Sequence, residues 1–254
     1  MGVFLVSVLV FAVTLGAALL GLYAHERLPP EQKSESARAI VGQVSGLVSI
    51  LLAIVLGTLI GTSFAFFGGQ RTALEALSAQ ILELDQALAQ YGPETKPARD
   101  RLKQSAELAY EAFWGGGQPD PALLKVAEPL ASYQATKAFL AGLHPTTEAQ
   151  KQGLAAANTL AGQIEHGRIL MDLQVASPPV NAGLVTILVI WAVLLFFGMG
   201  LFAESNHLVI SGLTFGALCV AFAIFLMLEL GQPYTGPFRI SPAALEQAIA
   251  NMDK

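Results

Sequence analysis

The stretch that decides the fold runs from Gly42 to Tyr91 and reads GQVSGLVSILLAIVLGTLIGTSFAFFGGQRTALEALSAQILELDQALAQY. Its first part, from Val44 to Phe67, carries no charged residue and consists mainly of Leu, Ile, Val, Phe and Gly. Since a helix rises about 1.5 Å per residue, this part is long enough to cross a hydrocarbon core of about 30 Å. It therefore predicts a membrane-spanning helix.

The second part of the stretch has a different hydrophobic pattern, which begins after Gly68 and Gly69. Apolar residues recur there at alternating steps of three and four, at Leu74, Leu77, Ile81, Leu84 and Leu88. This spacing is typical of a helix with a coiled-coil-like seam. We therefore expect one rod in two parts, with Gly68 and Gly69 as candidate hinge residues at the joint.

The composition of the chain indicates a membrane protein. Hydrophobic residues make up 54% of the sequence and charged residues only 13%, whereas soluble domains carry roughly 25% charged residues. The formal net charge of -5 leaves no basic stripe for nucleic acid, so we expect the lipid bilayer and no nucleic acid as a partner. Cys219 is the single cysteine, which excludes an intrachain disulfide.

Three further apolar runs predict three more spans, at Val3–Leu22, Ala182–Ala203 and Leu208–Leu230. The last two are separated by only four residues, so they should form an antiparallel hairpin. The predicted fold class is an all-α membrane protein with four transmembrane helices. A soluble antiparallel helical bundle is inserted between the second and the third of them.

Prolines and glycines divide the predicted bundle into helices. Gly92 and Pro93 end the long rod, a second helix begins near Pro97, and a kinked third segment runs from Pro119 to Phe139. A fourth helix is expected from Thr147 to Val175. The predicted domains are residues 1–67 with the first two spans, 68–181 with the bundle, 182–231 with the last two spans, and 232–254 with a loop and a short helix over Ala243–Asn251.

The second span carries a stripe of small residues. Ser45, Ser49, Ala53, Gly57 and Gly61 follow one another at i, i+4 steps, with Thr58 and Thr62 nearby. One interpretation is that these residues line a pore. The alternative is close helix packing within the protomer, because small residues let membrane helices approach one another. Thr58, Thr62 and Ser63 can donate hydrogen bonds to carbonyls of their own helix, so they do not require water.

Polar residues flank the last two spans and leave their interiors uncharged. The candidate interfacial groups are Glu204, Asn206, His207, Glu229 and Arg239, the last as a partner of Glu229 or of a lipid headgroup. None of the four spans has an ionisable group at mid-depth, which disfavours ion-coupled transport. A pore without charges remains possible, since hydrophobic constrictions can gate by dewetting.

The sequence offers no support for an enzyme, a cofactor or a metal site. Its four histidines are scattered without an HExxH pair, and the glycines at 115–117 lack the lysine that a phosphate-binding loop requires. Glu165 and His166 are adjacent and therefore point to different parts of a helix surface. We expect a protein without catalytic activity.

Three runs of the sequence resemble the bestrophin-like domain family of bacterial membrane proteins. They are RLPPEQKSESARAIVGQVSGLVSILLAIVLGTLIGTSF from Arg27, ILELDQALAQYGPETKPARDRLK from Ile81, and WAVLLFFGMGLFAESNHLVISGLTFGALCVAFAIFLMLELGQPYTGPFRISPAAL from Trp191. The resemblance implies a homo-oligomeric bacterial inner-membrane protein that passes inorganic ions, most naturally anions. The Arg-Phe-Pro-Asn signature of true bestrophins is absent, and Asp120 stands alone where their calcium clasp would need an acidic cluster.

Two functions follow from these observations. The first is an oligomeric channel in which copies of the second span surround a pore. The second is a non-conducting sensor or scaffold, whose bundle binds a partner or assembles copies through the leucine seam. The positive charges near the membrane are balanced on the two sides. The uncharged N-terminus and the charges of the first loop favour a bundle outside the cytoplasm, whereas the bestrophin resemblance implies the opposite orientation.

Overall fold

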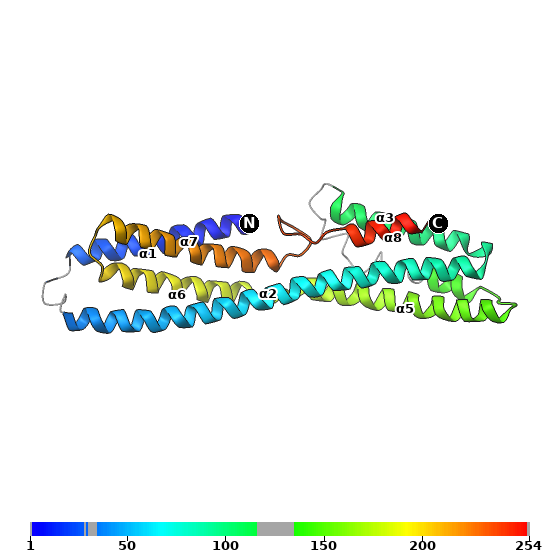
Figure 1. Ribbon diagram of the computed structural model, residues 1–254, viewed down its shortest axis with the longest axis horizontal. Coiled ribbons are helices and arrows are strands. Elements are labelled where there is room, and N and C mark those ends of the chain that lie inside the picture. The colour runs from blue at the N-terminus through cyan, green and yellow to red at the C-terminus, as the bar shows by residue number, and fades with distance from the viewer. Residues whose placement is uncertain (1, 28, 30–34, 116–134, 253–254) are drawn as a thin grey trace. The chain divides into compact units, whose positions relative to one another are not determined.

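The computed structural model describes the chain except for residues 1, 28, 30–34, 116–134 and 253–254. All regular structure in the described residues is helical. The elements, shown in Figure 1, are α1 Val3–Arg27, α2 Glu35–Tyr91, the 3₁₀ turn η2 Pro93–Thr95, α3 Lys96–Trp114, α5 Glu148–Ala176, α6 Ala182–Leu201, α7 His207–Leu230 and α8 Ala243–Asn251. Residues 135–141 are also helical, whereas most of the predicted third bundle segment, Asp120 included, lies outside the described residues.

The chain forms two compact units. Unit 1 contains Met1–Phe66 and Pro179–Gly231, and unit 2 contains Phe67–Pro178 and Gln232–Lys254. Helix α2 begins in unit 1 and ends in unit 2, without a break at Gly68 and Gly69. The short final helix, α8, occupies the residues predicted for it, and the segment that carries it belongs to unit 2.

In the part of the chain that the structure describes, four helices are long and apolar enough to cross a membrane, as the sequence predicts. They are α1, α2, α6 and α7. Asn181 and Asn206 start α6 and α7 with side chains that accept hydrogen bonds from Leu184 N and Val209 N, at 2.9 and 2.8 Å. Such N-caps satisfy backbone donors that have no partner inside the helix.

Helices α1, α6 and α7 form the centre of unit 1. The closest approach joins α1 to α6 at Gly21 and Gly200, where an added Cβ on Gly200 would overlap the carbonyl oxygen of Ala18. Small residues of α7 fill the interface as well, because Ala217 and Ala221 are buried. Of the two glycines in the middle of α7, Gly216 lies against Phe196, whose ring would be 3.0 Å from an added Cβ, whereas a Cβ at Gly212 would have no atom within 4 Å.

The leucine seam of α2 forms the core of unit 2. Leu74, Ile81, Leu84 and Leu88 are buried, and Leu77 packs against them. Residues of α3, α5 and α8 complete this core, together with Tyr234 and Ile240 from the segment between α7 and α8. The idea that the seam assembles copies of the chain is therefore wrong, because the seam is used within one protomer.

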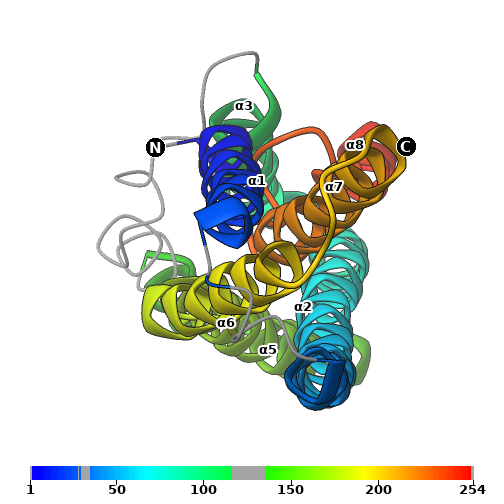
Figure 2. The ribbon, with the colours of Figure 1, turned by 90° about the vertical axis from the view of Figure 1, so that its left-hand side faces the viewer.

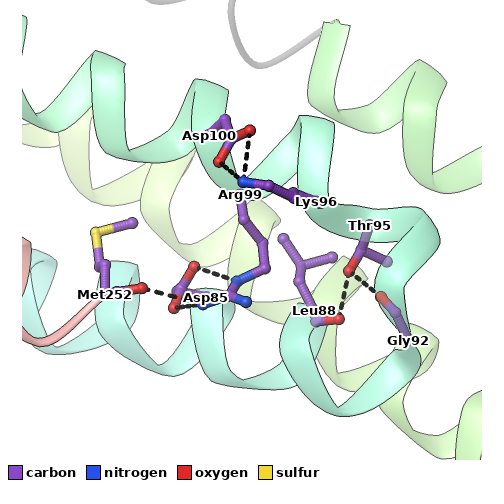
Figure 3. Close-up of polar contacts among 8 residues, drawn as sticks. All are labelled: Asp85, Leu88, Gly92, Thr95, Lys96, Arg99, Asp100 and Met252. Atoms are coloured by element: carbon purple, nitrogen blue, oxygen red, sulfur yellow. Dashed lines mark hydrogen bonds and ion pairs between the residues drawn. The ribbon is translucent and has the colours of Figure 1, made fainter. Parts of the chain in front are cut away.

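Helix ends in unit 2 are fixed by local hydrogen bonds. Thr147 begins α5 in a capping box, in which its hydroxyl accepts from Gln150 N at 3.1 Å and its own N–H donates to the Gln150 side chain. In the turn between α2 and α3, the buried Thr95 hydroxyl donates to the carbonyl oxygens of Leu88 and Gly92 (Figure 3). These bonds explain why α2 ends at Tyr91, before Pro93, and why α5 begins after Thr147.

An ion pair joins three parts of unit 2. Arg99 of α3 donates from Nε and Nη2 to the two carboxylate oxygens of Asp85 on α2, at 2.7 and 2.9 Å, as Figure 3 shows. Its Nη2 also donates to the carbonyl oxygen of Met252 at 3.0 Å. The side chain of Asp85 is only 4% exposed, so this bidentate pair fixes α3 and the C-terminal segment on α2.

Candidate functional site

The small-residue stripe of α2 lies partly against the protomer and partly outside it. Ser45 and Ser49 are half-buried, and the Ser45 hydroxyl lies 3.9 Å from the position of a Cβ on Gly198 of α6. The other five candidates are exposed, namely Ala53, Gly57, Thr58, Gly61 and Thr62. A Cβ added at Gly57 or Gly61 would meet nothing within 4 Å. Packing within the protomer therefore does not explain the second half of the stripe.

Helix geometry explains this division of the stripe. A helix turns by roughly 100° per residue, so each i, i+4 step advances the side chain by roughly 40° around the axis. Over the four steps from Ser45 to Gly61 the stripe moves by roughly 160°, which carries it from the packed side of α2 to the opposite side. Leu52 and Leu56 mark the packed side, because both are buried against α6 and α7.

Helix α2 is the least covered of the four predicted spans. Only 11% of its apolar window is buried, against 22 to 28% for the windows of α1, α6 and α7. Figure 2 shows the first part of α2 at the edge of unit 1. The exposed side also carries the large apolar residues Ile50 and Ile54, which are 59 and 60% exposed. This side of α2 is open to a membrane, to other copies or to an aqueous pore.

The hydroxyl groups of the exposed side are satisfied by their own helix. Thr58 donates to the carbonyl oxygen of Ile54 at 2.8 Å, and Thr62 donates to that of Thr58 at 2.9 Å, as predicted. For Ser63 the prediction is wrong, because its buried hydroxyl has no hydrogen-bond partner in the described part of the protein. The exposed side thus combines small apolar surface with hydroxyl oxygens and carries no charge.

One end of unit 1 carries a cluster of polar contacts. Arg38, near the start of α2, donates to the carbonyl oxygen of Phe202 at 3.0 Å and pairs with Glu204 at 3.3 Å. His25 of α1 is 2.8 Å from the carbonyl oxygen of Leu201. Glu204 is thus part of an exposed ion pair, Asn206 serves as a helix cap, and His207 is exposed. The contacts tie α1 and α2 to the turn between α6 and α7.

Glu229 is not an exposed interfacial group, which corrects the prediction from its position near a helix end. It is 3% exposed, and its neighbours Met227 and Leu230 are buried as well. The last turn of α7 is therefore covered on several sides, and a position close to the end of a span does not by itself imply contact with water. Arg239 is exposed and belongs to unit 2.

The candidate hinge residues are helical in the structure. Gly68 and Gly69 lie within α2, just past the boundary between the two units at Phe67, and a Cβ on either would meet nothing within 4 Å. Their conformation is thus one that alanine also adopts. Any role in bending remains a prediction.

A cavity of about 510 Å³ lies beside the Asp85–Arg99 pair in unit 2. Its lining includes Lys96 and Asp100, which pair with each other at 3.0 Å. Both acidic side chains of the lining, Asp85 and Asp100, are paired with basic ones, and Lys103 of the lining lies 3.9 Å from Glu107. The cavity is therefore a weaker candidate for an ion path than the exposed side of α2. Among the described residues, no group of three histidine, cysteine, aspartate or glutamate side chains is placed to hold a metal ion.

The helices and the open side of α2 define an all-helical membrane protein whose second span is largely uncovered. The model of the bestrophin-like domain matches residues 12–245, and the chain belongs to this family. The fold is similar to the crystal structure of a mutated bacterial bestrophin homolog from Klebsiella pneumoniae, with a TM-score of 0.56 and 14% sequence identity over 96% of this chain and 97% of that chain. No match was found among curated proteins.

Proposed function

We propose that this protein is a homo-oligomeric ion channel in which α2 lines the pore. The observation that carries the proposal is the exposure of Ala53, Gly57, Thr58, Gly61 and Thr62 in the protomer, while α1, α6 and α7 pack together. Membership of the bestrophin-like domain family and the fold of the Klebsiella homolog support a channel. Several copies arranged with this side of α2 inward would surround an axis with small residues and hydroxyl oxygens.

The chemistry of this side implies a pore without fixed charge in its membrane part. The residues from Val44 to Phe67 are uncharged, and the Thr58 and Thr62 protons are used by their own helix. Bulky apolar residues such as Ile50 and Ile54 would form the narrow part of such a pore and would gate it by excluding water. Anions are the expected ions by resemblance to bestrophins, with selectivity set by pore width and dehydration rather than by charged side chains.

Reconstitution in liposomes tests conduction. The purified protein is expected to pass halide ions across the membrane, measured as current in planar bilayers and as flux in vesicles. The absence of both halide and cation current over the full voltage range, with and without calcium, would contradict the channel.

Cysteine accessibility tests whether α2 lines the pore. In a Cys219→Ala background, Thr58→Cys should react with a charged, membrane-impermeant thiol reagent and lose current on modification. Phe222→Cys is the matched control, because Phe222 is 60% exposed in the protomer but lies on α7. It should stay unreactive. Reaction at Phe222→Cys with none at Thr58→Cys would place the pore elsewhere.

A non-conducting sensor or scaffold is the alternative function. The burial of the leucine seam removes the surface first considered for assembly, but α5 exposes Ile169, Leu170 and Leu173, which leaves an apolar surface for a partner. A protein that forms oligomers yet passes no ions would favour this alternative.

We also propose an arrangement in the bacterial inner membrane in which unit 1 spans the bilayer and unit 2 is a bundle outside it, on the extracytoplasmic side. Because the positive charges near the membrane are equally divided between its two sides, this orientation rests on the uncharged N-terminus and the charged first loop. With four spans, the C-terminus lies on the same side of the membrane as unit 2, so a fluorescent protein fused there should be exported and stay dark. Cytoplasmic fluorescence would show that the orientation is the opposite one.

A further inference from the structure

The chain passes between the two units at three places, which we call junctions. The first is Phe66–Phe67, the second Pro178–Pro179 and the third Gly231–Gln232. Each junction has a polar residue of unit 2 within four residues of it. This residue is Gln70 at the first junction, Gln174 at the second and Tyr234 at the third. Although they are far apart in the sequence, their side chains form one hydrogen-bonded chain.

This side-chain triad has a definite donor order. The Tyr234 hydroxyl donates to Gln70 Oε1 at 3.1 Å, and Gln70 Nε2 donates to Gln174 Oε1 at 2.6 Å. Gln70 has no exposed surface and Tyr234 is only 6% exposed. Since a buried amide without partners is costly, Gln70 holds its position only while both neighbours are in place.

Two features keep Tyr234 in its donor role. Burial raises the pKa of its phenol above the ordinary value of 10.0, and the Asp172 carboxylate raises that pKa further, so the hydroxyl keeps its proton to a higher pH than an exposed tyrosine does. The Tyr234 ring packs against the ring of Phe113, with centroids 5.0 Å apart. A hydrogen bond from Ile240 N to the carbonyl oxygen of Pro233, at 2.8 Å, closes the loop that contains Tyr234.

The following segment is anchored to the same aromatic group. Trp114 Nε1 donates to the carbonyl oxygen of Ile240 at 2.9 Å, and the Trp114 ring lies edge-on to Tyr234. Tyr234 is therefore held from one side by α3 and from the other by Gln70 of α2. A movement of the third junction that pulls Tyr234 away must break the bond to Gln70.

We infer that the Gln70–Gln174–Tyr234 triad is a conformational brace that couples the three junctions. While it is closed, the chain leaving α7, the end of α5 and the middle of α2 hold one arrangement inside unit 2. When the hydrogen bond from Tyr234 opens, Gln70 Oε1 is left buried without a donor. The hydrogen bond from Gln70 Nε2 to Gln174 is then weakened too. The brace thus transmits a change at one junction to the other two, whether or not the protein conducts ions.

Hydrogen exchange of the full-length protein in detergent tests the brace. Tyr234→Phe removes one hydroxyl and keeps the ring. It should raise local opening by roughly tenfold to a hundredfold, the range expected for an unsatisfied buried acceptor. The increase should be seen at the Ile240 amide near the third junction. It should also be seen near the second, at the Ser177 amide, which donates to the Gln174 carbonyl at 3.2 Å.

Tyr110→Phe is the matched control. Its hydroxyl donates to Glu246 Oε1 at 2.8 Å on the exposed surface of unit 2 and takes no part in the triad. The Tyr110 ring stacks on Trp114, with centroids 6.1 Å apart, and phenylalanine keeps this ring, so exchange at Ile240 and Ser177 should not change. Faster exchange at Ile240 alone in Tyr234→Phe would show that the bond is local and that no brace exists. Unchanged exchange at both sites would reject the proposal as well.

Gln70→Leu tests the central residue. It should accelerate exchange at both sites more than Tyr234→Phe does. If Gln70→Leu does not fold, the comparison of Tyr234→Phe with Tyr110→Phe decides the question by itself.

Discussion

Replacing Arg99 by leucine should strongly destabilise unit 2. The substitution removes both hydrogen bonds to the Asp85 carboxylate and the hydrogen bond to the Met252 carbonyl. Asp85 then stays behind as a negative charge whose side chain is only 4% exposed. The C-terminal segment loses one of its hydrogen bonds to α3 at the same time.

The size of the effect follows from the burial of the two partners. Removing one member of a buried ion pair costs about 3–5 kcal/mol, because the other charge is left desolvated. Arg99 itself is 29% exposed and borders a cavity of about 510 Å³ that can admit water. We therefore expect the lower end of that range, about 3 kcal/mol in the free energy of unfolding of unit 2.

Tryptophan fluorescence can measure this free energy for unit 2 alone. The chain has two tryptophans, Trp114 in the core of unit 2 and Trp191 on α6 of unit 1. In a Trp191→Phe background, the remaining signal reports the surroundings of Trp114. Urea titrations of the purified protein in detergent then give the unfolding midpoint for the parent and for Arg99→Leu.

Lys96→Leu is the control for this experiment. Lys96 and Asp100 form an ion pair on the same helix, but their side chains are 74 and 64% exposed, so its loss should cost less than about 1 kcal/mol. The double variant Asp85→Leu with Arg99→Leu should be more stable than Arg99→Leu, since it leaves no buried charge. If Arg99→Leu were no less stable than Lys96→Leu, the assignment of Asp85 as a desolvated charge would be wrong.

Three further changes test other parts of the structure. Gly200→Ala should lower the free energy of unfolding of unit 1 by about 1–3 kcal/mol, seen as a lower thermal unfolding temperature, because its Cβ would overlap the Ala18 carbonyl. Gly212→Ala on α7 should have little effect. Thr147→Ala should cost about 1 kcal/mol in the urea assay through loss of the capping box, and an unchanged midpoint would contradict its role. Burial raises the pKa of Tyr234 in the folded protein, so the protonated phenol stabilises unit 2 fully below pH 10.0. This stabilisation is lost as the pH rises from 10.0 toward the pKa in the folded protein. Unit 2 should therefore weaken more steeply above pH 10.0 than its Tyr234→Phe variant, and equal slopes would count against this shift.

Local patterns in the sequence predict much of the fold. Four apolar runs give the four long helices, and the step of three and four residues identifies the buried face of α2 in unit 2. Proline and threonine mark the ends of α2 and α5, because their effects depend only on neighbouring residues.

Features that depend on several elements are not predictable in this way. The contact of Gly21 with Gly200 requires two helices distant in sequence to cross at that level, whereas a Cβ on Gly57, Gly61 or Gly212 would meet nothing within 4 Å. The burial of Glu229 depends on what surrounds the end of α7. For the candidate pore residues, the i, i+4 spacing suggests a single face, but the rotation of the helix spreads the stripe over two sides of α2.

The division of unit 2 along the sequence has a consequence for the biogenesis of the protein. Unit 2 starts at Phe67, within α2, but Tyr234, Ile240 and Leu245, which complete its core, are translated only after all four spans. At about 5–20 residues per second, this leaves a delay of roughly 8 to 33 seconds before the core can close. Nascent chains that stop at Gly231 should therefore contain inserted spans beside an unfinished, protease-sensitive bundle.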